Sequence, residues 1–145
     1  MKHRPINSII LHCTDTPQSR KVTLQDIRRW HMQERGWEDV GYHFIVDQQG
    51  TIIHGRPTNR PGAHCHGHNQ TSIGVCYIGG MSEDGKEHID TRTPEQRKAL
   101  IELVKALMWE FGLRAEHIHC HNEYSNKACP CFKREDFLKE YWQSF

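Results

Sequence analysis

The residues best suited to chemistry lie near the end of the chain, between positions 119 and 131. This short segment brings imidazoles and thiols together with one lysine; its members are His119, Cys120, His121, Lys127, Cys129 and Cys131. Imidazole nitrogen and thiolate sulfur are ligands that Zn²⁺ prefers, but the spacing does not match a C-x2-C structural zinc module. One more ligand from upstream would complete a set of three with an open fourth position. That set is typical of a catalytic zinc site rather than a structural one.

His12 is well placed to be such an upstream residue. An aliphatic run over residues 6–11 predicts a buried strand, and the turn-forming segment 14–17 follows it. Ligands of open α/β sheets bind beyond the carboxyl ends of the strands, which is where His12 falls. Position alone leaves two interpretations open: a ligand, or a histidine that caps the strand by hydrogen bonding.

The remaining elements are predicted from hydrophobic period and from stop signals. Thr23 begins an amphipathic helix that runs to about Gln33 and is stopped by Gly36. Thr93 begins a longer helix with Pro94 at its first position, closed by Gly112. We expect further elements as follows: a buried strand over 72–80, a polar loop over 81–92, a short strand at 118 that delivers His119 and His121, and a terminal helix after 131.

Residues 42–47 and 51–54 flank Gln48-Gln49-Gly50 and predict a β-hairpin. Strict alternation would place Tyr42, Phe44 and Val46 on one face of the first strand, with His43 and Ile45 on the other. Tyr42 follows Gly41, a position where the backbone can bend and approach a ligand closely.

Composition indicates one globular domain. The chain has 145 residues, 36% hydrophobic and 26% charged, with a formal net charge of +1. Dispersed Lys and Arg give no footprint for nucleic acid, and no apolar run is long enough for membrane insertion. The basic N-terminus is followed by too short an apolar run for a signal peptide, so we expect a protein that is cytoplasmic when made.

Six cysteines without an export signal favour thiols and metal ligation over disulfides. Cys76, within the predicted strand 72–80, is expected to be a packing residue. Cys13, Cys120 and Cys131 flank the candidate site and are expected to be the most reactive thiols. The loop over 59–70 carries His64, Cys65, His66 and His68, which form either a second metal site or, in the interpretation we favour, a polar wall beside the active site.

Four separated motifs resemble the zinc-dependent N-acetylmuramoyl-L-alanine amidases of the type 2 amidase family. That family includes phage amidase-type lysozymes and animal peptidoglycan recognition proteins, and the resemblance is closest to the short phage type. The motifs stand in the same order over nearly the whole chain: Ile10-Leu11-His12-Cys13-Thr14; Gly41-Tyr42-His43-Phe44; the segment from Asn69 to Val75; and His121-Asn122-Glu123 with Lys127-Ala128-Cys129-Pro130.

The resemblance implies an α/β fold: a single amidase domain over residues 1–145 with a central mixed β-sheet flanked by helices. It implies Zn²⁺ as cofactor, with His12, His121 and Cys129 as ligands. Tyr42 matches the family's catalytic tyrosine, and Lys127 matches the catalytic lysine of the phage enzymes. The implied substrate is peptidoglycan, cut at the amide between N-acetylmuramic acid and L-alanine by a monomeric endolysin of phage or prophage type that reaches the cell wall after release.

The chemistry of these residues agrees with amide hydrolysis. A zinc with three protein ligands lowers the pKa of its water to about 7 and polarises a carbonyl. Tyr42 and Lys127 are suited to hydrogen-bond an oxyanion or to pass a proton to the leaving amine, and Glu123 is the alternative base. His119 and Cys131 are the alternatives as ligands.

Three other functions are considered. A peptidoglycan-binding module without catalysis would lack the ligand cysteine, whereas Cys129, Tyr42 and Lys127 are all present here. A zinc deaminase would need an H-x-E and a P-C-x-x-C pattern, which is absent. A nucleophilic cysteine hydrolase would need a cysteine with an orienting partner series, which is not evident.

Overall fold

The protein is described here by a computed structural model, which covers residues 4–145. Residues 1–3 belong to the basic N-terminus for which no signal peptide is predicted, and they lie outside the described residues. In chain order the helices and strands are β1 (Ser8–Cys13), β2 (Thr16–Pro17), α1 (Leu24–Arg28, continued by a π-helical segment Arg29–Glu34), β3 (Phe44–Val46), β4 (Ile52–His54), β5 (Ser72–Tyr77), β6 (Gly80–Met81), α2 (Pro94–Phe111), β7 (Ile118–Cys120) and α3 (Arg134–Gln143). Short 3₁₀ turns occupy Asn69–Thr71, Ala115–His117 and His121–Glu123.

A five-stranded mixed sheet forms the centre, in the order β4-β3-β5-β1-β7. Strands β3, β5, β1 and β7 are parallel, and only β4 is antiparallel, as the second arm of the predicted hairpin. Every residue of β1 and β5 is buried, as expected for central parallel strands covered on both faces. The α/β class with a central mixed sheet is therefore confirmed.

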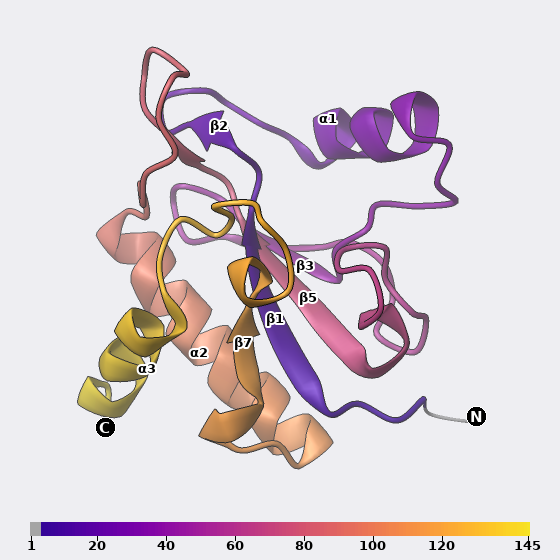
Figure 1. The fold of residues 1–145 in the computed structure, drawn as a ribbon, viewed down its shortest axis with the longest axis vertical. Helices are drawn as coiled ribbons and strands as arrows, with labels where there is room; N and C mark the ends of the chain where they lie inside the picture. Colours follow the sequence, from indigo (N-terminus) through magenta and orange to yellow (C-terminus); the bar gives the residue numbers. More distant parts are fainter. Residues whose placement is uncertain (1–3) are drawn as a thin grey trace.

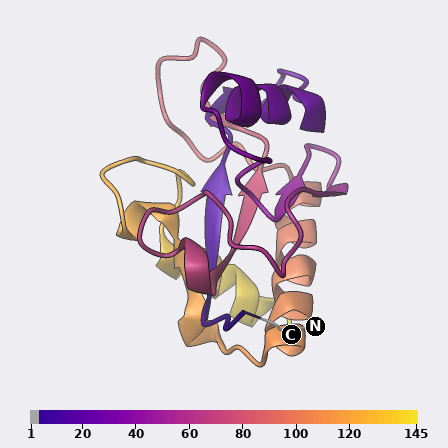
Figure 2. The same cartoon turned by 90° about the vertical axis from the view of Figure 1, so that its right-hand side faces the viewer.

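Helices cover the two faces of the sheet unequally (Figure 1). Helices α2 and α3 pack on one face, where Leu103 and Phe137 join Ile9 and Val75 in the larger hydrophobic cluster. On the other face Ile27 of α1 joins a smaller cluster that includes Ile45. Figure 2 shows α1 at the end of the molecule toward which β1 and β5 point.

Local capping explains why α2 begins and ends where it was predicted. Thr93 accepts a hydrogen bond from the backbone of Gln96, whose side chain accepts one from the backbone N–H of Thr93. Gly112 ends the helix in the left-handed conformation, with φ of 66°. None of the helices within residues 4–145 is both long enough and apolar enough to cross a lipid bilayer.

One prediction from strand alternation and one about thiol access are wrong. Tyr42 does not share a face with Phe44 and Val46; it packs with Ile45 on the α1 side, because β3 begins only at Phe44 and the preceding backbone bends. Cys13 and Cys120 are not among the accessible thiols: Cys13 is 2% exposed at the end of β1, and Cys120 is fully buried on β7.

Candidate active site

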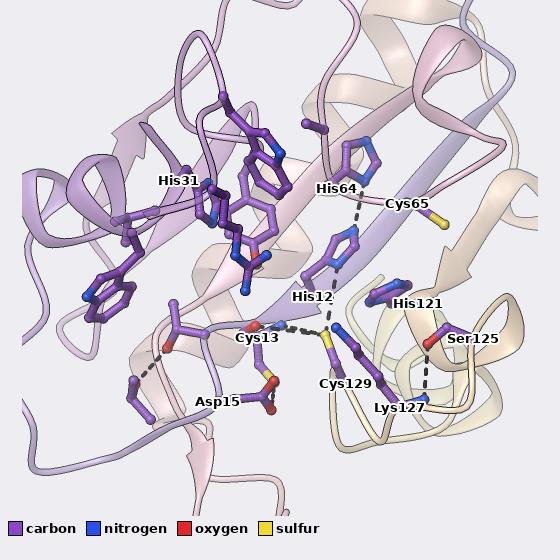
Figure 3. A pocket seen from close by; sticks show the side chains of 18 of the residues that line it. His12, Cys13, Asp15, His31, His64, Cys65, His121, Ser125, Lys127 and Cys129 are labelled. Carbon is purple, nitrogen blue, oxygen red and sulfur yellow. Dashed lines mark hydrogen bonds between the residues drawn. The ribbon is translucent and has the colours of Figure 1, made fainter. Parts of the chain in front are cut away.

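A pocket of about 800 Å³ opens between α1 and the carboxyl end of β1. Its lining includes all five residues singled out from the sequence: His12, Tyr42, His121, Lys127 and Cys129. Figure 3 shows His12, His121 and Cys129 converging at its base. The site therefore lies where open α/β sheets bind their ligands, beyond the strand ends.

Three of these side chains form a group able to hold a metal ion. The nearest ligand atoms of His12, His121 and Cys129 all lie within 4.8 Å of one another, and His12 Nδ1 is 3.9 Å from Cys129 Sγ. His12 is the last residue but one of β1, His121 follows β7 directly, and the pairing of these two adjacent strands brings the imidazoles to a centroid distance of 4.6 Å. The tertiary fold thus joins residues that are more than 100 positions apart.

His121 supplies the clearest sign of a missing ligand. Its Nδ1 is buried and has no hydrogen-bond partner, the one side-chain nitrogen or oxygen in that condition within residues 4–145. Buried polar atoms in native proteins are almost always satisfied, and an orphaned one indicates a bound ion or water.

The orientation of His12 is set by a chain of hydrogen bonds. Ser72 Oγ donates to the carbonyl of His68 at 2.7 Å, so its oxygen accepts from His64 Nε2–H at 3.1 Å. His64 Nδ1 is then unprotonated and accepts from His12 Nε2–H at 2.8 Å. This leaves the lone pair on His12 Nδ1, the nitrogen that faces Cys129. Burial lowers the pKa of both His12 and His64, so both imidazoles are neutral at pH 7.

Cys129 is held as a thiolate. Its sulfur accepts a hydrogen bond from the backbone N–H of Cys13 at 3.2 Å. The interaction with Cys13, with His12 and His121 nearby, outweighs the opposing effect of burial and lowers the pKa of Cys129 well below its usual range. The nearby sulfurs of Cys129 and Cys131, together with burial, raise the pKa of the Cys13 thiol, so Cys13 keeps its proton.

The donor set fits Zn²⁺. Two neutral imidazole nitrogens and one thiolate are ligands of catalytic zinc sites, and tetrahedral bonds of about 2.0–2.3 Å place such atoms roughly 3.3–3.8 Å apart. The spacing of 3.9 Å between His12 Nδ1 and Cys129 Sγ is close to this range, and all the ligand atoms of the trio lie within 4.8 Å of one another. The three residues leave one position open toward the pocket.

Tyr42 lies beside the trio. Its ring is 5.2 Å from that of His12 and 5.3 Å from that of His31. The preceding Gly41 donates its N–H to His31 Nδ1 at 2.7 Å, and a Cβ at Gly41 would meet the carbonyl oxygen of Ala63 at 2.3 Å, so only glycine fits there. Burial raises the pKa of Tyr42 well above its usual range, so the hydroxyl is protonated and able to donate.

Lys127 differs from Tyr42 in being exposed. It lines the same pocket, and Figure 3 shows its side chain next to Cys129. Its backbone N–H donates to Ser125 Oγ at 3.0 Å, while no hydrogen bond or ion pair holds its ammonium in the described part of the chain. A cation free to move over the open face of the trio is suited to meet a developing negative charge.

The alternative ligands and base lie elsewhere. His119 Nδ1 pairs with Glu123 Oε1 at 3.0 Å, and Glu123 Oε2 accepts from the backbone N–H of Cys120. Both carboxylate oxygens of Glu123 are thus engaged, and the residue does not line the pocket. Cys131 donates instead to the carbonyl of Gly80 at 3.2 Å.

The histidine-rich loop over residues 59–70 has a structural role that its sequence did not reveal. His64, Cys65 and His66 line the pocket and His68 stacks on Tyr124, but the loop forms no three-donor metal group among residues 4–145. His64 instead holds His12, as described above. No periodicity or motif signals this role, because the contact depends on tertiary proximity.

An open α/β pocket with a His/His/Cys group at the strand ends defines a class: hydrolases with a candidate metal centre. Residues 2–132 match the family model described as N-acetylmuramoyl-L-alanine amidase. The endolysin of Escherichia phage T7 is 39% identical over 137 residues, covering 94% of this chain and 85% of that protein. The endolysin of Klebsiella phage KP32 is 37% identical, covering 98% of this chain and 89% of that protein.

Solved structures agree. The N-acetylmuramoyl-L-alanine amidase LysC from Clostridium intestinale superposes with a TM-score of 0.79 at 31% identity, covering 95% of this chain and 85% of that one. The bumblebee peptidoglycan recognition protein SA gives a TM-score of 0.76 at 27% identity, covering 93% and 81%. The chain belongs to the N-acetylmuramoyl-L-alanine amidase family, and its activity is that of a peptidoglycan amidase.

Proposed function

We propose that this amidase hydrolyses the bond between N-acetylmuramic acid and L-alanine with one Zn²⁺ held by His12, His121 and Cys129. The observation that carries this proposal is the buried, unpartnered Nδ1 of His121 beside the lone pair of His12 and the thiolate of Cys129. Two neutral ligands and one anionic ligand leave a zinc site with a net charge of +1, which tempers its acidity relative to three histidines.

When bound, the zinc supplies a water of pKa near 7 and polarises the scissile carbonyl. Tyr42 is protonated at working pH and donates a hydrogen bond to the carbonyl oxygen as negative charge develops on it. Lys127 approaches from the open face, where its ammonium neutralises the oxyanion or passes a proton to the leaving amine. His64 fixes His12 in the tautomer that a ligand needs.

The walls of the pocket suit a substrate that carries carboxylates. Arg20 lies over the ring of Trp30 and Arg35 over that of Trp37, at 5.3 and 5.2 Å from the ring centroids. All four residues line the pocket. Guanidinium groups held on aromatic rings bind carboxylates with defined geometry, as the stem peptide of peptidoglycan requires.

We propose further that residues 1–145 act as one amidase domain and as a monomer, in the manner of an endolysin that reaches the cell wall after release. The two hydrophobic clusters share one sheet, which supports a single domain. The similarity to the endolysins of phages T7 and KP32 over most of their length supports the proposal that this chain acts as an endolysin. The alternative of a binding module without catalysis is disfavoured because the Cys129 thiolate, Tyr42 and Lys127 all line one pocket.

The test is a paired assay of metal content and of peptide release from purified cell wall. Replacing Cys129 with serine is expected to remove zinc and activity together, because a hydroxyl is a far poorer zinc ligand than a thiolate. Cys65→Ser is the matched control: it removes another buried thiol of the pocket wall and should keep both properties. A Cys129→Ser variant that retained zinc and activity would overturn the ligand assignment.

A further inference from the structure

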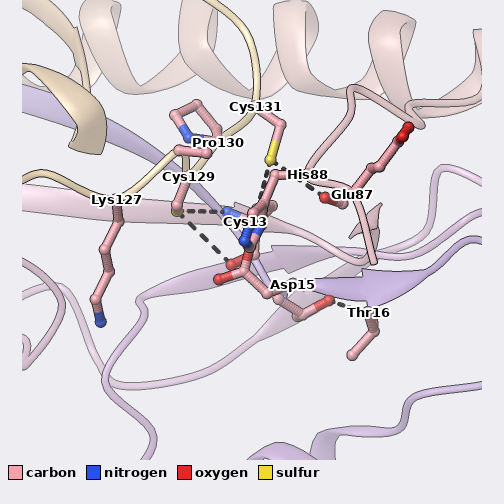
Figure 4. A network of polar contacts seen from close by, with 12 residues as sticks. Cys13, Asp15, Thr16, Glu87, His88, Lys127, Cys129, Pro130 and Cys131 are labelled. Atoms are coloured by element: carbon pink, nitrogen blue, oxygen red, sulfur yellow. Dashed lines mark hydrogen bonds and ion pairs between the residues drawn. The ribbon is translucent and has the colours of Figure 1, made fainter. Parts of the chain in front are cut away.

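A second cluster of metal-ligating side chains lies next to the first but shares none of its members. The ligand atoms of Cys13, Asp15 and Cys131 all lie within 4.8 Å of one another. Cys13 Sγ is 3.8 Å from Cys131 Sγ and donates to Asp15 Oδ1 at 3.3 Å. Figure 4 shows the thiols of Cys13 and Cys131 and the Asp15 carboxylate gathered at one place.

His88 supplies a candidate fourth donor, which stands next to the carboxylate and outside the group of three. His88 Nδ1 lies 3.4 Å from Asp15 Oδ1. The loop that carries His88 is tied to β6 by a β-bridge between His88 and Met81, and by the hydrogen bond from Ile89 N–H to the Gly80 carbonyl. His88 is therefore held by backbone contacts near the cluster, although its side chain is half exposed.

Three of the six distances among these four donors match the edges of a zinc tetrahedron. Zn–S bonds of about 2.3 Å and Zn–N or Zn–O bonds of about 2.0 Å place two sulfurs roughly 3.8 Å apart and mixed pairs roughly 3.3–3.5 Å apart. The three separations given above, 3.8, 3.3 and 3.4 Å, fall on these values. Two thiolates with one imidazole and one carboxylate select thiophilic cations such as Zn²⁺ over Mg²⁺ or Ca²⁺.

Two of these residues have a left-handed backbone conformation. Asp15 and Cys131, with φ of 56° and 72°, are the non-glycine residues of positive φ within residues 4–145. A side chain in this region costs conformational free energy, and such outliers concentrate at functional sites. Here both bends turn a donor toward the thiol of Cys13.

We propose that Cys13, Cys131, Asp15 and His88 form a second metal site, for a thiophilic divalent cation such as Zn²⁺. On binding, each thiol releases its proton to solvent and its sulfur bonds to the metal. Cys13 follows His12 in the chain, and Cys131 stands two residues after Cys129. The ion therefore ties the end of β1 and the loop after β6 to the loop that supplies Cys129, and it braces the catalytic centre from outside.

The competing use of the same thiols is a disulfide between Cys13 and Cys131. Their sulfurs are 3.8 Å apart, in van der Waals contact, and a disulfide would consume both of them and leave Asp15 and His88 as an exposed pair. The convergence of a carboxylate with the two thiols, with an imidazole next to that carboxylate, favours the metal, and the experiment separates the two outcomes.

The experiment measures zinc bound per chain, by equilibrium dialysis of reduced protein against buffered free Zn²⁺. The parent is expected to bind two ions. Cys131→Ser and His88→Ala should each lose or weaken one of them by at least tenfold, and His12→Ala should lose the other. Cys65→Ser, a buried thiol outside both clusters, should still bind two. Because His88 is half exposed, its replacement should not disturb folding.

One zinc in the parent that persists in Cys131→Ser and vanishes in His12→Ala would overturn the second site and leave the proposed catalytic centre intact. The reverse pattern would overturn the catalytic assignment and leave the second site. A parent mass two daltons lower after purification without reductant, with no second zinc after reduction, would assign Cys13 and Cys131 to a disulfide instead. Co²⁺ substitution gives an independent readout, since loss of the Cys131 thiolate should reduce the sulfur-to-metal charge-transfer absorption.

Discussion

Removing the His64 imidazole should weaken metal binding, although His64 is not itself a ligand. In His64→Leu the Nε2–H of His12 loses its acceptor at 2.8 Å, and nothing then selects the tautomer with the lone pair on Nδ1. In this variant the buried N–H of His12 lacks an acceptor in both the metal-free and the metal-bound protein. The zinc affinity therefore changes only by the difference in free-energy cost between these two states. Outer-sphere partners of this kind are worth about 10- to 100-fold in metal affinity, or roughly 1.4–2.7 kcal/mol.

The assay is a competition titration of zinc against a chromophoric chelator, with thermal unfolding of the metal-free protein as a check on folding. His64→Asn should recover most of the affinity, because its side-chain oxygen can take the position of the Nδ1 acceptor. His66→Leu is the matched control: it removes an exposed imidazole of the same loop that makes no contact with His12. A folded His64→Leu protein that bound zinc as tightly as the parent would refute the hydrogen-bond chain.

Three further predictions concern catalysis, thiol access and acid stability. Tyr42→Phe and Lys127→Met should keep zinc but lower kcat by about 10²–10⁴, measured as peptide release, and rates equal to the parent would remove both residues from the mechanism. In native reduced, metal-free protein iodoacetamide should label Cys131 but not Cys76, which is 0% exposed on β5; mass mapping that found Cys76 modified first would contradict the packing described. Burial lowers the pKa of His43 from 6.5 to about 4, so the folded state binds fewer protons than the unfolded state between these values. Unfolding free energy of the metal-free protein should therefore fall as pH drops from 6.5 toward 4, by up to roughly 3 kcal/mol from this group, and the slope should be shallower in His43→Asn; equal slopes would show that His43 does not contribute.

The elements that sequence reasoning placed correctly are those whose determinants are local. The capping residues Thr93 and Gln96, the left-handed Gly112 and the apolar period between them define α2 without tertiary information. The turn at Gly50 does the same for the hairpin of β3 and β4. The order of the motifs along the chain was enough to predict the family and the fold.

The parts that escaped prediction depend on where the backbone bends or on which distant residues meet. Tyr42 left the expected face because the chain bends before β3, which strict alternation cannot foresee. His64 was one of several histidines in a polar loop until the fold placed it against His12. The proximity of Cys13 and Cys131 was foreseen only as general reactivity near the site, because their separation of 118 positions carries no spacing signal.

The central claim is that one zinc ion is bound by His12, His121 and Cys129, and anomalous diffraction at the zinc absorption edge tests it most directly. Crystals of the reduced protein grown with zinc should show an anomalous peak between His12 Nδ1, His121 Nδ1 and Cys129 Sγ, at about 2.0–2.3 Å from each. A separate peak among Cys13, Asp15, His88 and Cys131 would report the second site without affecting this result. An anomalous peak bonded to His12, His121 and Cys131 rather than to Cys129 would contradict the account. The absence of any peak at His12, His121 and Cys129 would also contradict it.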